Sequence, residues 1–446
     1  MTMVDEEKID EDTAAEHIHG ICLKTGPPRR IGVELEWLVR DARNPGMPVP
    51  ARRIAAAVSE FDTLSESDPV SAFDSLPGLP TSSQPGALPS GATLTTEPGG
   101  QLEISSQPAD SLTDLVDATL ADLAALRSAA DAAGLELAGF GLDPIRPPRR
   151  LLTLPRYAAM EAFFDRGGPW GRQMMCTTAA IQVSLDAGDD SDRTGGYRHR
   201  WRLLHAVGPV LVAAFANSPL RCGRPTGWLS SRQQVWSRMD PGRTRPPLLG
   251  PDLREAWARY ALDAQLMCVR NEGSADWSVP DGLTLREWVR GDAADRMRPP
   301  TAEDLDYHLS TLFPPVRPHG HLELRMIDAQ PGDGWVVPLA VVTALFGDDR
   351  AGDDALAAVE RLWAGHEPAG EWPLGQPGGN PWPRAARLGP ADPAIAQASR
   401  ECFAAARSAL DRMAAPAPVT AAVDDFIEHF VDRNRCPADD LLEESP

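Results

Sequence analysis

Lysine is almost absent from this sequence. Its 446 residues include 43 basic side chains, of which only Lys8 and Lys24 are lysine and 41 are arginine. A P-loop, a kinase-type phosphate site and a Schiff base each require a lysine amine. These three kinds of site are therefore excluded beyond Lys24, and any phosphate chemistry there must use arginine, backbone amides and metal ions.

Paired cysteines, a secretory signal and long apolar segments are also missing. The six cysteines are scattered with no CxxC pair, so neither a zinc site nor a disulfide framework is predicted. Residues 1–17 are acidic, where a signal peptide is basic and then apolar. The longest apolar run, residues 206–216, is much shorter than the ~20 residues of a membrane-spanning helix. We therefore expect a cytoplasmic protein whose thiols are reduced.

The charge balance narrows the kinds of partner. The chain carries 64 acidic against 43 basic residues, a formal net charge of -21. Such a surface repels the phosphate backbone of nucleic acids and anionic lipid headgroups. We therefore expect small-molecule substrates and neither nucleic acid nor a membrane surface as a partner. The sequence indicates no obligate protein partner.

Hydrophobic periodicity predicts a mixture of strands and helices. Alternation with a period of two predicts strands, and apolar residues at helical spacing predict helices. The expected strands are residues 31–39, 93–106 in two pieces around a Pro98-Gly99-Gly100 turn, 136–142, 174–186 and 321–328. The expected helices are residues 110–133, 197–216, 252–266, two segments with capping signatures at Thr284 and Thr301, and most of the last hundred residues apart from a loop at 367–392.

The order of these elements favours a single α+β domain. Long helices and loops separate the strands without the regular βαβ alternation of a doubly wound sheet. The candidate site residues also extend over most of the chain, from Glu34 to Arg325. We expect one catalytic domain over residues 29–435, an acidic and loosely ordered segment at 1–28, an irregular Pro/Ser/Gly-rich loop at 63–92 and a C-terminal tail at 436–446.

Four predicted strands carry charged or amide side chains on the face opposite their apolar residues. In residues 31–39 the apolar side chains alternate with Glu34 and Glu36. An ordinary solvated face explains each strand taken singly. Because four strands share the pattern, we favour a common polar cavity. The remaining members of this set are Glu97, Glu103, Gln182, Glu323 and Arg325.

Convergence of these faces would bring five carboxylates into one cavity. Two carboxylates about 4 Å apart repel by roughly 4 kcal/mol at an effective dielectric constant near 20, so the cluster requires cations. Carboxylate and amide oxygens without cysteine are ligands for magnesium or manganese rather than zinc. Magnesium held by carboxylates commonly binds substrate phosphates as well. The metal ions and Arg325 would then neutralise the phosphate charge.

Motifs of other catalytic classes are missing. The chain has no GxSxG sequence and no cysteine–histidine nucleophile motif, so acyl-enzyme hydrolysis is not expected. The Pro98-Gly99-Gly100 segment has two explanations, a tight turn and a loop that binds phosphate through its backbone amides. A tight turn is the commoner use of a glycine pair.

Several motifs together resemble the second type of glutamate–cysteine ligase, the plant-like and bacterial branch. The resemblance extends from about residue 32 to residue 328. Within the branch, the chain most resembles the actinobacterial enzymes that supply γ-glutamylcysteine for ergothioneine synthesis. The motifs are GVELE at 32–36, EPGGQLE at 97–103, TAAIQVSLD at 178–186, GWLSSRQQVW at 227–236 and FPPVRPHGHLELR at 313–325.

This resemblance implies a fold and a reaction. The fold would be glutamine-synthetase-like, with a curved antiparallel sheet forming a funnel and helices packed outside. The reaction would be a carbon–nitrogen ligation in which L-glutamate, L-cysteine and ATP give γ-glutamylcysteine, ADP and phosphate through γ-glutamyl phosphate. ATP would be a co-substrate, and two or three magnesium ions, replaceable by manganese, would serve as cofactors.

Matching the family motifs residue by residue implies roles for the candidate residues. Arg325 would stabilise the transferring groups, with Glu97 as the second catalytic residue, and Arg232 would bind a glutamate carboxylate. Gln182 and Thr178 would contact substrate. Plant members carry an arginine where this chain has Thr177, so Arg172 is expected to help hold glutamate. The implied metal ligands are Glu34, Glu36, Glu97, Glu103 and Glu323.

Alternatives to this function remain open on the sequence alone. One is a γ-glutamyl ligase with a different amine acceptor, because nothing in the motifs defines a thiol pocket. Another is a metal-dependent phosphohydrolase that uses the same carboxylates. A third is a protein that binds divalent cations or nucleotide without turnover.

Overall fold

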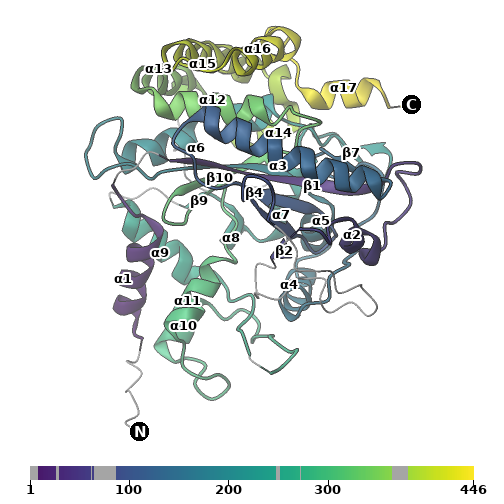
Figure 1. Cartoon of the computed structure of the whole chain (residues 1–446). Helices are drawn as coiled ribbons and strands as arrows, with labels where there is room; N and C mark the ends of the chain where they lie inside the picture. The colour runs from purple at the N-terminus through teal and green to yellow at the C-terminus, as the bar shows by residue number, and fades with distance from the viewer. Residues whose placement is uncertain are drawn as a thin grey trace.

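A mixed sheet crosses the middle of the molecule, with helices stacked on both of its faces (Figure 1). The computed structural model describes residues 9–26, 30–61, 63–64, 87–247, 252–271, 273–363 and 380–445. Most of the loop expected at 63–92 lies outside these described residues. No helix in the described part of the chain is long and apolar enough to cross a membrane.

The main sheet has the strand order β2-β3-β4-β1-β6-β10-β9, and β5 pairs with the far end of β1. Its pairs are antiparallel, as expected, except for the parallel pair of β2 with β3. A separate hairpin joins β7 and β8. The strands are β1 (Ile31–Asp41), β2 (Thr63–Leu64), β3 (Thr93–Thr96), β4 (Leu102–Ser105), β5 (Leu135–Ala138), β6 (Ala180–Leu185), β7 (Leu220–Arg221), β8 (Arg224–Pro225), β9 (Val316–Pro318) and β10 (Leu322–Asp328).

Helices cover one face of the sheet and build the core there. α3, α6 and α12 pack on β5, β10 and β6, and α13, α15 and α16 form a further layer outside them (Figure 1). α12 is apolar all round, as a helix enclosed between two layers should be. The members are α3 (Leu112–Ala132), α6 (Tyr197–Ala214), α12 (Val336–Gly347), α13 (Asp349–Val359), α15 (Pro393–Arg412) and α16 (Ala417–Phe426).

Shorter helices lie on the opposite side of the sheet. α4, α5 and α7 contact one another there, and α1, α8, α9, α10 and α11 form a group beside them (Figure 1). Their bounds are α1 (Glu11–Cys22), α4 (Pro155–Asp165), α5 (Trp170–Thr177), α7 (Ser231–Met239), α8 (Pro241–Thr244), α9 (Leu253–Asp263), α10 (Leu285–Arg290) and α11 (Ala302–Leu309). The remaining α-helices are α2 (Ala51–Ala57), α14 (Pro381–Leu388), which packs on α6, and α17 (Pro437–Glu443).

Helix starts follow the predicted capping chemistry. The side chain of Ser111 accepts a hydrogen bond from the Asp114 amide at the start of α3. Thr284 and Thr301 each form a reciprocal capping box with an acidic residue three positions later. The expected helices at 110–133, 284 and 301 are therefore confirmed.

Both chain ends are more ordered than the sequence suggested. Within residues 1–28, expected to be loosely ordered, α1 buries Ala14, Ile18 and Cys22, which lie on one side of the helix at a spacing of four. Within the expected tail at 436–446, α17 follows the buried Cys436. Inside the expected loop at 367–392, α14 is a helix.

The strand predicted at 174–186 begins later than expected. Met174 belongs to the last turn of α5, and β6 starts only at Ala180. The hydroxyls of Thr177 and Thr178 donate to the carbonyl oxygens of Gln173 and Met174 at 2.6 Å. Such bonds to the carbonyl four residues earlier let a threonine-rich stretch complete a helix although its sequence alternates like a strand. The strand predicted at 136–142 likewise shortens to β5.

A buried histidine in α6 makes folding pH-dependent. Burial lowers the pKa of His205 to about 4, whereas the hydrogen bond to the Trp201 carbonyl opposes this shift. The unfolded state therefore binds more protons than the folded state between about pH 4 and 6.5. His205 contributes stability that is complete above pH 6.5 and is lost as the pH falls toward 4.

We predict that His205→Phe flattens part of this pH dependence. Nε2 of His205 is buried with no hydrogen-bond partner, so an apolar ring of similar size should cost less than about 1 kcal/mol at pH 7. The loss of unfolding free energy from pH 7 to pH 5 should shrink by about 1–2 kcal/mol. Urea denaturation at both pH values measures this loss of unfolding free energy. If the variant lost as much as the wild-type protein, His205 would not be the source of this part of the pH dependence.

Candidate active site

Strand register places the predicted polar residues on one face of the sheet. Glu36 of β1 lies opposite Glu103 of β4, and Glu34 of β1 lies opposite Gln182 of β6. Directly opposed residues of antiparallel strands point to the same face. The apolar residues of β1 that alternate with the glutamates are buried on the other face. The prediction that these polar faces converge is confirmed.

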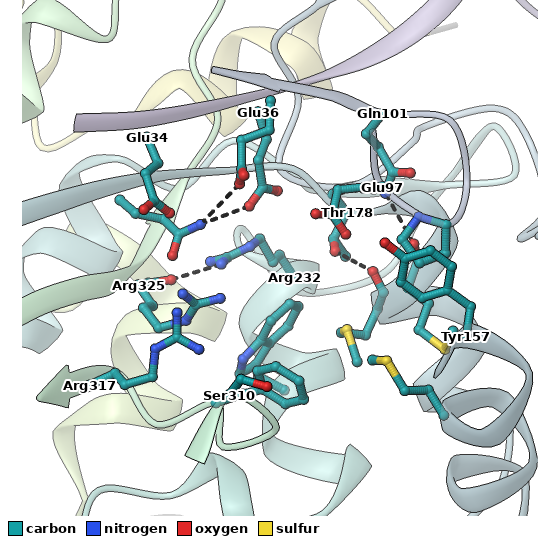
Figure 2. Close-up of a pocket in the computed structure, with 18 of the residues that line it drawn as sticks. Glu34, Glu36, Glu97, Gln101, Tyr157, Thr178, Arg232, Ser310, Arg317 and Arg325 are labelled. Carbon is teal, nitrogen blue, oxygen red and sulfur yellow. Dashed lines mark hydrogen bonds between the residues drawn. The ribbon is translucent and has the colours of Figure 1, made fainter. Parts of the chain in front are cut away.

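A pocket lies over this face, between the sheet and helices α4, α5 and α7 (Figure 2). Its cavity volume is about 70 Å³. The charged side chains that line it, within the described part of the chain, balance in number. They are the carboxylates Glu34, Glu36, Glu97 and Glu103 and the guanidinium groups Arg156, Arg232, Arg317 and Arg325.

Gln182 links the carboxylates in the middle of the sheet. Its Nε2 donates to Oε1 of Glu36 at 3.0 Å and to Oε2 of Glu103 at 3.5 Å. Glu103 also accepts from the Thr95 hydroxyl, and Glu36 accepts from the Ala180 amide. Oε1 of Gln182 is buried and has no hydrogen-bond partner. A buried amide oxygen beside carboxylates is a ready ligand for a cation.

These oxygen donors suit magnesium or manganese, but by themselves they do not form a complete coordination shell. Within the described ranges, no three His, Cys, Asp or Glu residues are grouped so as to hold a metal ion. Magnesium usually takes one or two carboxylates and completes its shell with water and substrate phosphates. The donor set therefore fits magnesium that binds together with a phosphorylated substrate.

Glu323 differs from its predicted role as a metal ligand. Arg317 donates from Nε to Oε2 at 2.6 Å and from Nη2 to Oε1 at 3.1 Å, and Arg325 also bonds to Oε1. Burial raises the pKa of Glu323, but the two guanidinium groups outweigh that effect and lower it to about 2. Both oxygens of Glu323 are engaged, and its two arginines rather than Glu323 itself line the pocket. In this arrangement Glu323 positions cations.

Arg232 enters the pocket from α7 with donors to spare. Its Nη2 donates to the Arg325 carbonyl oxygen at 2.7 Å, and its guanidinium lies 4.5 Å from the ring centre of Trp236. Nε and Nη1 are buried without hydrogen-bond partners. Burial lowers the pKa of Arg232, whereas the Asp328 carboxylate, 3.9 Å away, opposes this shift. A buried guanidinium that is held in place and still has donors without hydrogen bonds is suited to a bound carboxylate.

Glu97 occupies the turn between β3 and β4. Its amide donates to the Gln101 carbonyl at 2.9 Å, and its own carbonyl accepts from Gly100, whose φ is +86°. A Cβ on Gly99 would lie 2.4 Å from the carbonyl oxygen of Cys176 in α5. The Pro98-Gly99-Gly100 segment is thus a tight turn packed against a helix, which decides between its two explanations.

We predict that Gly99→Ala disturbs both stability and the site. The added methyl would collide with backbone rather than with a flexible side chain, at a cost of about 1–3 kcal/mol. Gly20→Ala is the matched control, because Gly20 lies in α1 with nothing within 4 Å of its Cβ position. That change should be neutral or stabilising. Thermal unfolding compares the two, and equal melting temperatures would refute the packing argument.

Several pocket residues were not predicted from the sequence. The sequence did contain a signal for Arg317, because Arg317 precedes Glu323 by six residues and faces it across the β9–β10 pair. Arg156 and Tyr157 had none, because α4 shows no polar stripe and both are buried. Trp236 looked like an ordinary apolar residue of α7.

A second cavity lies at the beginning of β1. Its volume is about 400 Å³, and it is lined by Lys24, Arg30, Ser184 and His321 among others. Glu34 lines both this cavity and the pocket. The two spaces therefore share the first glutamate of the GVELE motif as a lining residue.

Comparisons with known proteins show the family of the chain. The model of glutamate–cysteine ligase family 2 matches residues 30–445. The chain belongs to this family. It is 37% identical to the glutamate–cysteine ligase EgtA of Mycobacterium tuberculosis over 98% of this chain and 91% of the relative.

More distant proteins are also similar. The chloroplastic glutamate–cysteine ligase of Arabidopsis thaliana is 29% identical over 78% of this chain and 64% of its own length. A crystal structure of a glutamate–cysteine ligase from Francisella tularensis in complex with AMP aligns with 94% of this chain and 85% of its own, at a TM-score of 0.48 and 11% identity.

The structure brings together all but one of the predicted substrate contacts of this family member. Thr178, Gln182 and Arg232 line the pocket. Arg172 does not. Its side chain is 51% exposed and binds Asp165 at 2.5 Å and Glu161 at 3.1 Å. The expectation that Arg172 compensates for Thr177 is therefore corrected, because the surface carboxylates of α4 hold it away from the pocket.

Proposed function

We propose that the protein joins the γ-carboxylate of L-glutamate to the amine of L-cysteine with conversion of ATP to ADP and phosphate. The observation that carries the proposal is the pocket in which four carboxylates and three arginines of the family motifs meet, with Arg156 as a fourth arginine from outside those motifs. The similarity to EgtA of Mycobacterium tuberculosis supports a role in supplying γ-glutamylcysteine for ergothioneine synthesis.

The reaction has two steps. A γ-carboxylate oxygen of glutamate attacks the γ-phosphorus of ATP, and the bond to the ADP oxygen breaks to leave γ-glutamyl phosphate. The amine of cysteine then attacks the acyl carbon, loses a proton and expels phosphate. Both steps gather negative charge at the reacting centre, so preorganised cations are the main catalytic requirement.

The roles of the residues follow from where each one lies. Arg232, whose buried Nε has no hydrogen-bond partner, would bind a carboxylate of glutamate. Arg317 and Arg325, both held by Glu323, would stabilise the transferring phosphoryl group. Bound magnesium would supply further positive charge beside the phosphates. The residues that would hold magnesium are Glu34, Glu36, Glu97, Glu103 and the Oε1 of Gln182.

The two cavities suggest how the substrates divide. The space of about 70 Å³ over the carboxylates suits small amino acids, whereas the cavity of about 400 Å³ offers room for a nucleoside. Lys24 and Arg30 line the larger cavity, and Glu34 lines both. The nucleotide would therefore enter by the larger cavity, with its terminal phosphate near Glu34.

The test is phosphate release from ATP and magnesium with glutamate, with and without cysteine, followed by mass analysis. We expect release that depends on cysteine, with one γ-glutamylcysteine formed per phosphate. Release that ignores cysteine and gives no dipeptide would instead indicate a phosphohydrolase.

Substitution of one arginine inside the pocket and one outside it tests the assignment of the site. Arg325→Ala should lower kcat by about 100-fold or more, because it removes a cation beside the transferring group. Arg172→Ala should change kcat and KM less than about threefold, because it removes a surface ion pair. Glu97→Gln should behave like Arg325→Ala. Circular dichroism verifies that each variant is folded, and full activity of Arg325→Ala would refute the site.

A further inference from the structure

A buried aspartate at the end of β10 lies behind the pocket. Asp328 does not line the pocket, but its Oδ1 lies 3.9 Å from Nη1 of Arg232, which does. The two side chains are only 1% and 2% exposed. At 3.9 Å the two groups attract each other as charges but form no hydrogen bond. Asp328 is therefore a buried counter-ion that leaves the guanidinium donors of Arg232 unoccupied.

An irregularity in β10 turns Asp328 toward the pocket side of the sheet. Regular alternation would put Asp328 and Glu323, five residues apart, on opposite faces. The register between β10 and β6 shifts within this stretch, so that Glu323 lies opposite Ser184 and Asp328 lies opposite Ala180. Ser184 and Ala180 are four residues apart in β6 and share a face, so Asp328 shares the face of Glu323. Bulges that re-aim a side chain in this way are common beside active sites.

Three hydrogen bonds fix the Asp328 carboxylate. Oδ2 accepts from the Asn217 amide at 3.0 Å and from the Ser218 hydroxyl at 2.6 Å, and Oδ1 accepts from the Ser230 hydroxyl at 3.0 Å. A Cβ on Gly141 would lie 2.4 Å from Cγ of Asp328, so the backbone lies close against the carboxylate as well. Because these contacts hold both oxygens, the carboxylate cannot turn to accept the N–H groups of the nearby guanidinium.

The same two hydroxyls hold the first turn of α7. Ser218 accepts a hydrogen bond from the backbone amide of Arg232 at 3.1 Å. Ser230, the N-cap of α7, accepts from the Gln233 amide at 3.2 Å. The backbone of Arg232 is thus linked to Asp328 through one hydroxyl, and its guanidinium faces the same carboxylate directly.

We propose that Asp328 is a positioning residue for the binding of glutamate, and the proposal rests on the proposed ligase function. It acts through Arg232, whose buried guanidinium requires a counter-ion. It supplies that charge and fixes the first turn of α7, while Nε of Arg232 keeps no hydrogen-bond partner and is left for the substrate. An aspartate bonded to the guanidinium would compete with the glutamate carboxylate for the same donors, and this one does not.

The first test is Asp328→Asn, which keeps the shape of the side chain and removes its charge. The KM for glutamate should rise by about tenfold or more, because Arg232 loses its counter-ion and an amide cannot accept all three hydrogen bonds. The KM values for ATP and cysteine should change less than about threefold. Equal rises in all three KM values, or a KM for glutamate that stays constant or falls, would overturn the proposal.

Coupling to Arg232 separates positioning from a general loss of structure. In an Arg232→Gln background there is no guanidinium to position. Asp328→Asn should there lower kcat/KM for glutamate by less than about threefold, against about tenfold or more in the wild-type background. Additive losses would show that Asp328 does not act through Arg232.

Ser218→Ala tests the same link with a smaller change, and it decides the question if Asp328→Asn does not fold. It removes the hydroxyl that donates to Asp328 and accepts from the Arg232 amide. The KM for glutamate should rise by about three- to tenfold, with the KM for ATP unchanged. A folded Ser218→Ala variant with the wild-type KM for glutamate would count against the proposal.

Asp122→Asn is the matched control. Asp122 is a buried aspartate of α3 that accepts from the backbone amides of Ser90 and Ala92 and does not line the pocket. This variant should lower the melting temperature and leave the KM for glutamate unchanged. If it raised that KM as much as Asp328→Asn did, the effect would be one of stability alone and the proposal would be wrong.

Failure of the positioning role and failure of the ligase function give different results. If wild-type enzyme forms no γ-glutamyl product from glutamate, cysteine and ATP, the ligase function itself is wrong. If it forms the product but the losses of Asp328→Asn and Arg232→Gln are additive, the function holds and only the role of Asp328 is wrong.

Discussion

The register between β1 and its two neighbours is the constraint on which the site depends. It places Glu36 opposite Glu103 and Glu34 opposite Gln182, so three strands direct polar groups to one face. A slip of β1 by one residue would turn Glu34 and Glu36 into the apolar core and the core residues of β1 into the pocket. The buried residues of β1 and the helices behind them therefore maintain the site as well as the fold.

Acidic residues concentrated in this way require compensation, and the structure supplies it with arginine. Glu323 is enclosed by Arg317 and Arg325, and Arg232 lies near Asp328. Removing one member of such a buried group would leave an uncompensated charge, which is far more costly than removing an exposed pair. Within the described residues, the lining of the pocket is thus a balanced set of charges.

Local sequence patterns predicted the strands of the sheet well but did not predict which arginines line the pocket. Alternation in residues 31–39 gave the correct faces because burial on one side of a strand is a local, period-two property. The strand at 174–186 started too early because Thr177 and Thr178 close a helix with their hydroxyls. Arg156 and Arg172 look alike in sequence, and only tertiary contacts place one in the pocket and the other on surface carboxylates.

The use of arginine rather than lysine in this site has a physical explanation. Arg317 makes two bonds to one carboxylate, and Arg232 combines a bond to a carbonyl, a stacked tryptophan and two remaining donors. A lysine ammonium carries the same charge but cannot present donors in a fixed plane or stack on a ring in this way. A pocket that must hold its cations rigid before the substrates bind therefore requires guanidinium groups.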